Sequence, residues 1–414
     1  MLFIFYVHYI RYKIVQEYMS IFKKMGPGVL VAAAFIGPGT VAICILAGSQ
    51  YQFAILWALV ISIIATIFLQ EMTARLGIVT QKGLAKNLRE QLQNPIIKTV
   101  VIAVVLLAIV IGNATYEAGN IAGASLGLEA IFGTEYLSFY PVFIGAAAAL
   151  ILGLDNYILI ERVLVFLVII MSLSFCATAI YTQPDILSLL KGMLVPQIPE
   201  GSIFLIVALV GTTVVPYNLF LHASLVTEKW SSSSDLKFAK RDTIVAIALG
   251  GLVSLSIVVV AASLNDGVNG VLDIAKSLEP LYGDFAKYLI GIGLLAAGIT
   301  SAITAPLAAA YVVKNCLGWE EGISSNKFKA VWIIIIAIGI GSSLLKIKPL
   351  ELIQLAQIAN GILLPIIAIF LLWIVNRNSV MGTYKNTMKQ NIIGIAIILF
   401  AIFLGAKSII KVFM

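Results

Sequence analysis

The chain has 414 residues, of which 61% are hydrophobic and 11% charged, and its formal net charge is +7. Because soluble domains usually carry about a quarter charged residues, this composition excludes a soluble protein and indicates an integral membrane protein. The 3 cysteines and 2 histidines show neither a zinc-binding spacing nor a disulfide framework, and no phosphate-binding loop occurs. We therefore expect no cofactor, no ATP-driven pump and no enzyme.

Residues 1–24 begin with the apolar stretch MLFIFYVHYI. No basic region precedes this stretch and no small-residue cleavage site follows it, so we interpret it as a short cytoplasmic lead and not as a signal peptide. The rest of the chain, 25–414, is expected to form a single transmembrane domain.

The run from Met25 to Gln70 contains no charged residue. Since one membrane span takes about 20 residues, this run predicts two helices with a turn near residues 48–52. Further spans are predicted at 96–127, 139–154, 161–182, 202–227, 241–264, 284–313, 328–345, 350–376 and 391–412. The predicted fold is all-α, with eleven transmembrane helices.

The basic residues predict the orientation of these spans. With the N-terminus in the cytoplasm, most of the 27 lysines and arginines fall on cytoplasmic loops, as the positive-inside rule requires. We therefore expect a multi-pass protein of the plasma membrane, the inner membrane in a bacterium. The positive charge is distributed as in a membrane protein, so nucleic acid is not an expected partner; the bilayer is, and no obligate protein partner is evident.

Two predicted spans contain helix-breaking residues at mid-depth. The first has Gly37-Pro38-Gly39-Thr40, and the sixth has Gly211-Thr212-Thr213 followed by Pro216-Tyr217. In hydrocarbon, freed backbone groups are tolerated only where they line a cavity or are buried in protein. Breaks at matching places in two five-helix halves are typical of transporters built from inverted repeats, with the substrate between the breaks. We place repeat one at about 25–182, repeat two at about 202–376 and an extra helix at about 391–412.

The chain resembles the NRAMP family of proton-coupled divalent-metal transporters, which have the leucine-transporter-like fold. Four stretches in the family's order carry this resemblance, at residues 26–80 (GPGVLVAAAFIGPGT and onward), 182–196 (TQPDILSLLKGMLVP), 211–226 (GTTVVPYNLFLHASLV) and 355–382 (LAQIANGILLPIIAI and onward). The resemblance implies a 5+5 inverted repeat with helices one and six broken.

The residues at the implied metal site differ from the family pattern. The family's Asp-Pro-Gly-Asn motif reads Gly37, Pro38, Gly39 and Thr40 here. Its alanine carbonyl, its methionine sulfur and the following Pro-His align with Thr212, Val215, Pro216 and Tyr217. The carboxylate, the amide and the thioether are therefore missing. Gln357 of helix ten is kept, and Asn360 lies close to it without a family counterpart that we can place.

Two substrate classes fit this sequence. In the first, the substrate is a Mg²⁺-like ion or a broad range of divalent cations, and Thr40 and Thr212 are weak metal ligands. The smaller residues make room for the ion to enter with part of its water shell, because Mg²⁺ dehydrates reluctantly. Transition metals are disfavoured without the sulfur ligand. In the second, the uncovered half-helix N-terminus holds a small organic solute such as an amino acid. A non-transporting receptor is a third alternative.

Three residues are candidates for proton movement, which the resemblance implies. Glu117 is an acid well inside the third span, and intramembrane acids are functional by default. The family usually has a second acid three residues on, where this chain has Asn120. His222 is kept from the family's sixth helix and could relay protons. The alternative for Glu117 is a structural role as a protonated, hydrogen-bonded acid between helices. The alternative for His222 is a structural role as a packed histidine.

Overall fold

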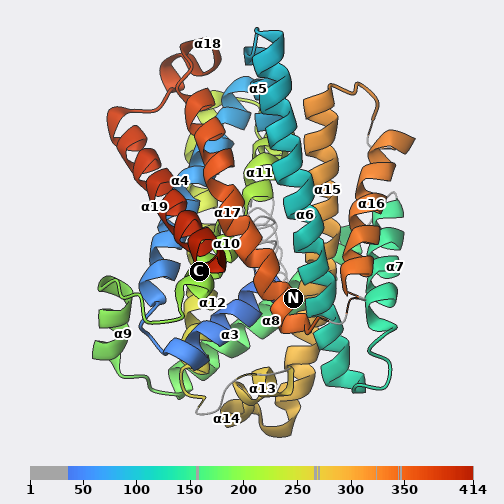
Figure 1. The fold of residues 1–414 in the computed structure, drawn as a ribbon, viewed down its shortest axis with the longest axis vertical. Coiled ribbons are helices and arrows are strands. Elements are labelled where there is room, and N and C mark those ends of the chain that lie inside the picture. The colour runs from blue at the N-terminus through green and yellow to red at the C-terminus, as the bar shows by residue number, and fades with distance from the viewer. Residues whose placement is uncertain are drawn as a thin grey trace, which may run out of the picture.

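The computed structural model describes residues 36–413, except 155–157, 265–267, 269–270, 323, 344 and 346. In these ranges every regular element is a helix (Figure 1). The long helices are α3 (Pro38–Tyr51), α4 (Leu56–Thr80), α6 (Pro95–Phe132), α7 (Tyr140–Gly153), α8 (Ile158–Tyr181), α10 (Ile203–Thr213), α11 (Pro216–Lys229), α12 (Leu236–Ala261), α15 (Ala286–Leu317), α16 (Asn326–Ser343), α17 (Pro349–Val375) and α19 (Met388–Phe413).

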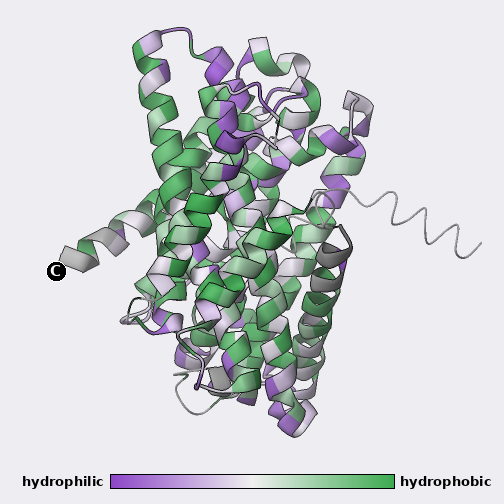
Figure 2. Cartoon of the chain, turned by 90° about the vertical axis from the view of Figure 1, so that its right-hand side faces the viewer, coloured by the Kyte–Doolittle hydropathy of each residue, from purple (hydrophilic) through white to green (hydrophobic). Residues whose placement is uncertain are grey.

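The described part of the chain contains 8 helical segments long and apolar enough to cross a membrane, with α10 and α11 counted as one segment. Two shorter apolar helices, Tyr140–Gly153 and Val165–Tyr181, and the half-helix α3 complete the set. Together they correspond to the predicted spans, with bounds close to the predicted ones, except that residues 25–35, the start of the first span, lie outside the described residues. Hydrophobic residues fill the middle of the molecule and hydrophilic ones its two ends (Figure 2).

The sequence analysis missed the short helices outside the spans. These are α5 (Leu84–Gln91), α9 (Ile186–Leu194), α13 (Val271–Lys276), α14 (Glu279–Tyr282) and α18 (Asn378–Met381). Each is too short to satisfy the span criterion. The predicted cytoplasmic lead, 1–24, lies outside the described residues. The turn predicted near 48–52 lies a few residues later, at 52–55, since α3 extends to Tyr51 and α4 begins at Leu56. Gln52, at the end of α3, has a positive φ of 49°.

Most of the long helices form two groups. Helices α3, α4, α10, α11 and α12 pack on one another, and α6, α7, α15 and α16 form the second group. Helix α17 contacts both groups and crosses the view obliquely in front of them (Figure 1). Small residues allow the closest approaches: a Cβ on Gly298 of α15 would lie 2.4 Å from Cβ of Ala124 on α6. Because helices in lipid have no hydrophobic driving force to associate, close van der Waals contacts of this kind hold them together.

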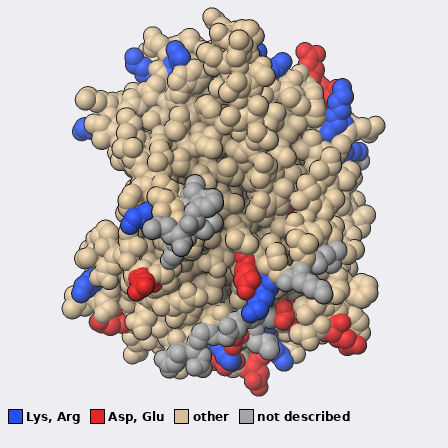
Figure 3. Space-filling model, viewed as in Figure 1, with Lys and Arg blue, Asp and Glu red and all other residues tan. Residues whose placement is uncertain are grey.

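Charged side chains gather towards the two ends of the molecule and are sparse across the middle of the face in Figure 3. Helices α5 and α18 lie at one end, and α13 and α14 at the other (Figure 1). This distribution is the one expected for a protein whose middle third lies in hydrocarbon.

Candidate functional site

Helix α3 begins abruptly in the buried interior. Its N-cap, Gly37, is extended (φ −88°, ψ 176°), and Pro38 occupies the first helical position. Proline suits this position because its missing N–H has no helical acceptor to lose. Gly37 has no side chain to cap the helix, and no side-chain cap is present. The first turn of α3 therefore has no side-chain cap among the described residues.

The second break separates α10 from α11. Helix α10 ends at Thr213, the backbone of Val214 and Val215 is non-helical, and Pro216 begins α11. The residue before a proline is disfavoured in the helical region, so Val215 is extended, with φ −77° and ψ 117°. Pro216 therefore separates α10 from α11.

The two breaks meet. Thr40 Oγ1, in the first turn of α3, lies 2.8 Å from Thr212 Oγ1, in the last turn of α10. Both threonines are fully buried. Residues far apart in the sequence are thus joined by a hydrogen bond between two hydroxyl groups, at the point where both helices are interrupted.

Helix α17 closes over this pair. A Cβ on Gly39 would lie 2.2 Å from the amide nitrogen of Gln357, and one on Gly211 would lie 1.9 Å from its backbone oxygen. Ser301 of α15 approaches Gly37 in the same way, with Oγ 2.9 Å from the Cβ position. The space that the small residues were expected to leave is therefore taken up by Gln357 and Ser301 in this conformation.

Several buried polar atoms near the breaks have no hydrogen-bond partner among the described residues. They are Tyr116 Oη, Tyr217 Oη, Ser301 Oγ, Gln357 Oε1, Asn218 Oδ1 and Asn360 Nδ2. Buried polar groups are nearly always paired, because leaving one unpaired costs about 1–3 kcal/mol. A cluster of such atoms indicates a place where a ligand or water completes the hydrogen bonds.

Three of these residues, Tyr116, Asn218 and Ser301, were not predicted as site residues from the sequence. Tyr116 packs edge-on against Tyr217, with ring centroids 5.4 Å apart, and its hydroxyl lies 3.6 Å from the Cβ position of Gly37. Ser301 comes from α15, which has no break. The only available signal was that Tyr116 and Ser301 are polar residues inside apolar spans.

Glu117 and Asn120 lie on another face of α6. Asn120 Nδ2 donates to Glu117 Oε2 at 3.2 Å, and a Cβ on Gly339 of α16 would lie 2.7 Å from Glu117 Cγ. Glu117 is fully buried, and its other oxygen has no hydrogen-bond partner among the described residues. The acid therefore packs against α16, while its neighbour Tyr116 faces the breaks.

His222, on α11, is also fully buried, and its Nδ1 lies 2.7 Å from Gln70 Oε1 on α4. Its Nε2 has no hydrogen-bond partner in the part of the chain that the structure describes. A neutral imidazole with Nδ1–H donating to the amide oxygen leaves Nε2 free to accept a proton.

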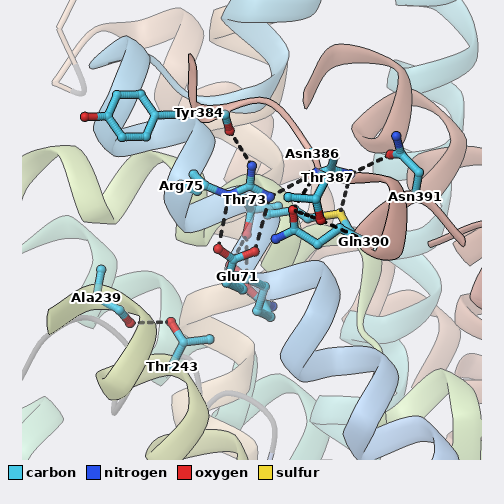
Figure 4. Close-up of polar contacts among 12 residues, drawn as sticks. Glu71, Thr73, Arg75, Ala239, Thr243, Tyr384, Asn386, Thr387, Gln390 and Asn391 are labelled. Carbon is cyan, nitrogen blue, oxygen red and sulfur yellow. Dashed lines mark hydrogen bonds and ion pairs between the residues drawn. The ribbon is translucent and has the colours of Figure 1, made fainter. Parts of the chain in front are cut away.

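A second polar cluster lies where α4 meets the segment between α17 and α19 (Figure 4). Arg75 pairs with Glu71, four residues before it on the same helix, at 3.0 Å. It also donates to the backbone oxygen of Tyr384 at 2.5 Å and to Asn386 Oδ1 at 2.6 Å. Asn386 in turn donates to Asn391 Oδ1 at 3.0 Å. Arg75 therefore links α4 to the backbone at Tyr384 and to the side chain of Asn386.

No group of three or more His, Cys, Asp or Glu side chains comes together as a metal cage in the described part of the chain. The arrangement is instead a buried set of hydroxyl and amide groups between two interrupted helices. Interrupted helices around a buried polar centre define a membrane transporter. The chain belongs to the family described as natural resistance-associated macrophage protein-like (Nramp), whose model matches residues 28–411.

Relatives with curated names are transporters and not enzymes. The chain is 28% identical over 400 residues to the divalent metal cation transporter MntH of Yersinia pestis, covering 94% of each chain. It is 30% identical over 305 residues to the protein of the same name from Erwinia tasmaniensis, covering 71% of this chain and 72% of the relative.

Solved structures confirm the fold. The manganese transporter of Eremococcus coleocola matches with a TM-score of 0.77 at 21% identity, covering 95% of this chain and 87% of that one. The nucleobase–cation symporter Mhp1 matches with a TM-score of 0.55 at 15% identity, covering 94% and 92%. The predicted leucine-transporter-like fold with broken first and sixth helices is therefore confirmed.

Proposed function

We propose that the protein is a secondary transporter of divalent metal cations that favours Mg²⁺-like ions over transition metals. The observation that carries this proposal is the neutral set of hydroxyl and amide groups, without carboxylate or sulfur, at the meeting point of the two breaks. Relatives named as divalent metal cation transporters support the general class. The substitutions at the site support the narrower substrate range.

The acceptors at the site are hard oxygen atoms. Gln357 Oε1 is buried and unpartnered, and the hydroxyls of Thr40 and Thr212 already face each other. Asn218, in the first turn of α11, has an unpartnered Oδ1. Oxygen ligands suit Mg²⁺ and Ca²⁺, whereas thioether sulfur selects softer metals. Val215 supplies no sulfur, so the preference for a transition metal is weakened.

Mg²⁺ keeps several of its waters when it binds proteins. In the closed conformation Gln357 and Ser301 take up the space beside Gly39 and Gly37. Transport therefore requires α17 to move away from α3 and α10, which would admit an ion with part of its water shell. The threonine hydroxyls then contact water or the ion in place of each other.

Proton coupling is the second part of the proposal. Glu117, Asn120 and His222 are its candidates, and the buried acid and the imidazole each have an unpartnered atom. Since Glu117 packs against α16 and not against the breaks, it would act on the helix interface and not as a ligand. We keep the predicted orientation, with the N-terminus in the cytoplasm, and the repeat bounds 25–182 and 202–376 as part of this proposal.

A small organic solute remains the second candidate substrate. The specific observation in its favour is the uncapped N-terminus of α3, because such an end binds carboxylates in transporters with broken helices.

Uptake into proteoliposomes tests the substrate. Vesicles containing a Mg²⁺ indicator or a Mn²⁺ indicator receive the parent protein, Thr40→Ala, Thr212→Ala or Thr243→Ala. Thr243 is the matched control, since its buried hydroxyl bonds only within its own helix, to Ala239 O at 2.8 Å. We expect Mg²⁺ entry into parent and control vesicles and at least about a tenfold loss in the two site variants. Absence of any divalent-ion entry above empty vesicles would refute the proposal.

A pH indicator inside the same vesicles tests coupling. Cation entry should bring protons with it in the parent protein and in the control Glu129→Gln, which lies on the same helix. Glu117→Gln should keep cation entry and lose the proton signal. An unchanged proton signal in Glu117→Gln removes this acid from the mechanism.

A further inference from the structure

A groove with a volume of about 650 Å³ lies between α17 and α19, which pack side by side (Figure 1). This volume falls within the range of about 300–1,000 Å³ that is typical of ligand pockets. The apolar part of its lining consists of Ile369, Leu372, Ile395, Ile398 and Leu399. Ile395 and Leu399 are 50% and 60% exposed, so the groove opens on the outer surface of the helix bundle, where the bilayer lies. Such a lining suits a hydrocarbon chain.

One end of the groove is polar. Asn376 and Arg377, directly after α17, complete its lining. The amide of Asn376 exchanges two hydrogen bonds of 2.8 Å with Asn391, near the start of α19, and also donates to the backbone oxygen of Leu372 at 2.7 Å. Because this amide already has its partners, Arg377 is the polar group of the groove that is left to bind a ligand.

The guanidinium group of Arg377 stacks on Trp373, with its central carbon 4.6 Å from the centroid of the ring. Stacking uses the face of the guanidinium and leaves the N–H donors at its edge available. Within the described part of the chain, no acid pairs with Arg377 and no group accepts a hydrogen bond from its side chain. Tryptophan is enriched at the level of the lipid headgroups. The arginine is therefore positioned at that level with its donors unused.

The chain around this arginine is positively charged. Between Asn376 and Asn391 it contains Arg377, Lys385 and Lys389 and neither aspartate nor glutamate. Basic residues close to the membrane surface attract anionic lipids. In the proposed orientation this end of the molecule faces the cytoplasm, and the cytoplasmic leaflet is the one that carries anionic lipids. The charge of this end of the groove therefore complements a negative headgroup.

We propose that the groove between α17 and α19 binds an anionic phospholipid, with an acyl chain along Ile395 and Leu399 and its phosphate on the guanidinium of Arg377. Arginine binds phosphate through two parallel N–H···O bonds. A zwitterionic lipid has the same chains and phosphate, but its cationic headgroup meets the positive charge of Lys385 and Lys389, so it binds more weakly. The lipid site shares no residue with the proposed cation site, and it does not depend on which substrate is transported.

Quenching of tryptophan fluorescence by brominated lipids tests this proposal. The full-length protein is reconstituted into phosphatidylcholine vesicles that contain either phosphatidylglycerol or phosphatidylcholine with brominated acyl chains, at equal mole fractions. A brominated chain quenches an indole ring that it contacts. The quenching that is lost in Trp373→Phe, which keeps an aromatic ring for the arginine to stack on, isolates the contribution of Trp373. We expect Trp373 to prefer the phosphatidylglycerol at least about tenfold, since more than one basic residue attracts it.

A variant locates the phosphate. Arg377→Gln removes one positive charge and should reduce the preference for phosphatidylglycerol about fivefold. Lys287→Gln is the matched control, because Lys287 is also an exposed basic residue over an aromatic ring, 5.0 Å from the centroid of Tyr288, but lies near the start of α15 and outside the groove. This control should keep the full preference.

Three outcomes would overturn the lipid site. The first is equal quenching of Trp373 by the two brominated lipids in the parent protein. The second is an unchanged preference in Arg377→Gln. The third is relief of the quenching by inorganic phosphate in the medium, since free phosphate has no chain to fill the groove and should not displace a lipid. The parent protein alone decides the first and third outcomes, even if a variant fails to fold, and none of them bears on cation uptake, which is measured separately.

Discussion

At the residue scale, the central feature is a hydrogen bond between two threonines. Thr40 lies in the first turn of α3 and Thr212 in the last turn of α10, and their hydroxyls lie 2.8 Å apart. This bond joins α3 to α10 and stabilises the closed arrangement. Because an opening motion must break it, the same bond contributes both to stability and to the barrier between conformations.

A double-mutant cycle measures this bond. Thr40→Val and Thr212→Val are each expected to destabilise the protein, since each leaves a polar partner behind, and the double variant should cost less than the sum. The coupling energy should be about 1 kcal/mol. Reversible unfolding in detergent gives the free energies. Strictly additive effects would show that the two hydroxyls do not interact.

Asp185 provides a pH-dependent test outside the spans. Its carboxylate caps α9 by accepting from the N–H groups of Leu187 and Ser188, and hydrogen bonding, first with the Ser188 hydroxyl and then with these N–H groups, lowers its pKa below 3.8. A lowered folded pKa means that the stabilisation is present above the unfolded pKa and is lost as the pH falls.

Hydrogen exchange at the amides of α9 reports this loss. Protection of the Leu187 and Ser188 amides should be constant near neutral pH and should fall as the pH drops below about 4. Asp185→Asn should make protection independent of pH in that range. The same fall in protection in both proteins would exclude the carboxylate as its cause.

At the scale of elements, glycines determine how closely the helices approach. Gly211 of α10 lies against the backbone of α17, and Gly361 of α17 lies against Val207 of α10, where a Cβ would come within 2.7 Å of the Val207 backbone oxygen. The contact is reciprocal and holds α10 and α17 together beside the break. These two helices must separate if the site is to open towards the end where α10 begins.

Gly211→Ala should push α10 and α17 apart at this contact. Its Cβ would lie 1.9 Å from a backbone oxygen, which no side-chain rotation can relieve, so we expect a destabilisation of about 1–3 kcal/mol. Gly341→Ala, on α16, is the matched control because nothing lies within 4 Å of its Cβ position.

The control should be neutral or slightly stabilising, since alanine favours helix by about 0.5–1 kcal/mol over glycine. Thermal unfolding in detergent compares the two variants. Equal midpoints would mean that α10 and α17 do not pack as closely as described.

At the scale of the whole molecule, Arg75 links elements that are remote in sequence. Its guanidinium contacts Glu71 on its own helix, the backbone of Tyr384, and Asn386 (Figure 4). The Asn376–Asn391 amide pair, with both donor–acceptor distances at 2.8 Å, links α17 to α19 nearby. The end of the molecule near α18 is thereby held to α4 by a continuous polar network.

Arg75→Ala should destabilise the protein by about 2–3 kcal/mol, because the arginine and glutamate side chains are only 9% and 16% exposed and the partners lose charged hydrogen bonds. Lys82→Ala is the control, since Lys82 and Glu90 form an ion pair with 39% and 41% exposure. An exposed pair contributes about 0–1 kcal/mol. Thermal unfolding measures the loss of stability in each variant. Similar losses in the two variants would show that the Arg75 network contributes no more stability than an exposed ion pair.

Much of the fold follows from the amino-acid sequence. The spans, their bounds within a few residues and the two breaks all depend on local properties, namely apolar length, proline and glycine. The short helices α5 and α9 were not predicted, because helices of fewer than ten residues are too short to form the long apolar runs that identify a membrane span. The ion pair of Glu71 and Arg75 was predictable because helical spacing alone brings the two side chains together.

The sequence by itself determined a membrane transporter with paired mid-membrane breaks and a site without carboxylate or sulfur ligands. Only the tertiary structure decided that Thr40 bonds to Thr212, that Gln357 and Ser301 fill the space beside the glycines, and that Glu117 turns towards α16 while Tyr116 turns towards the breaks. The physical reason is that helix periodicity places residues on a face, whereas the partner of that face depends on how all the helices pack.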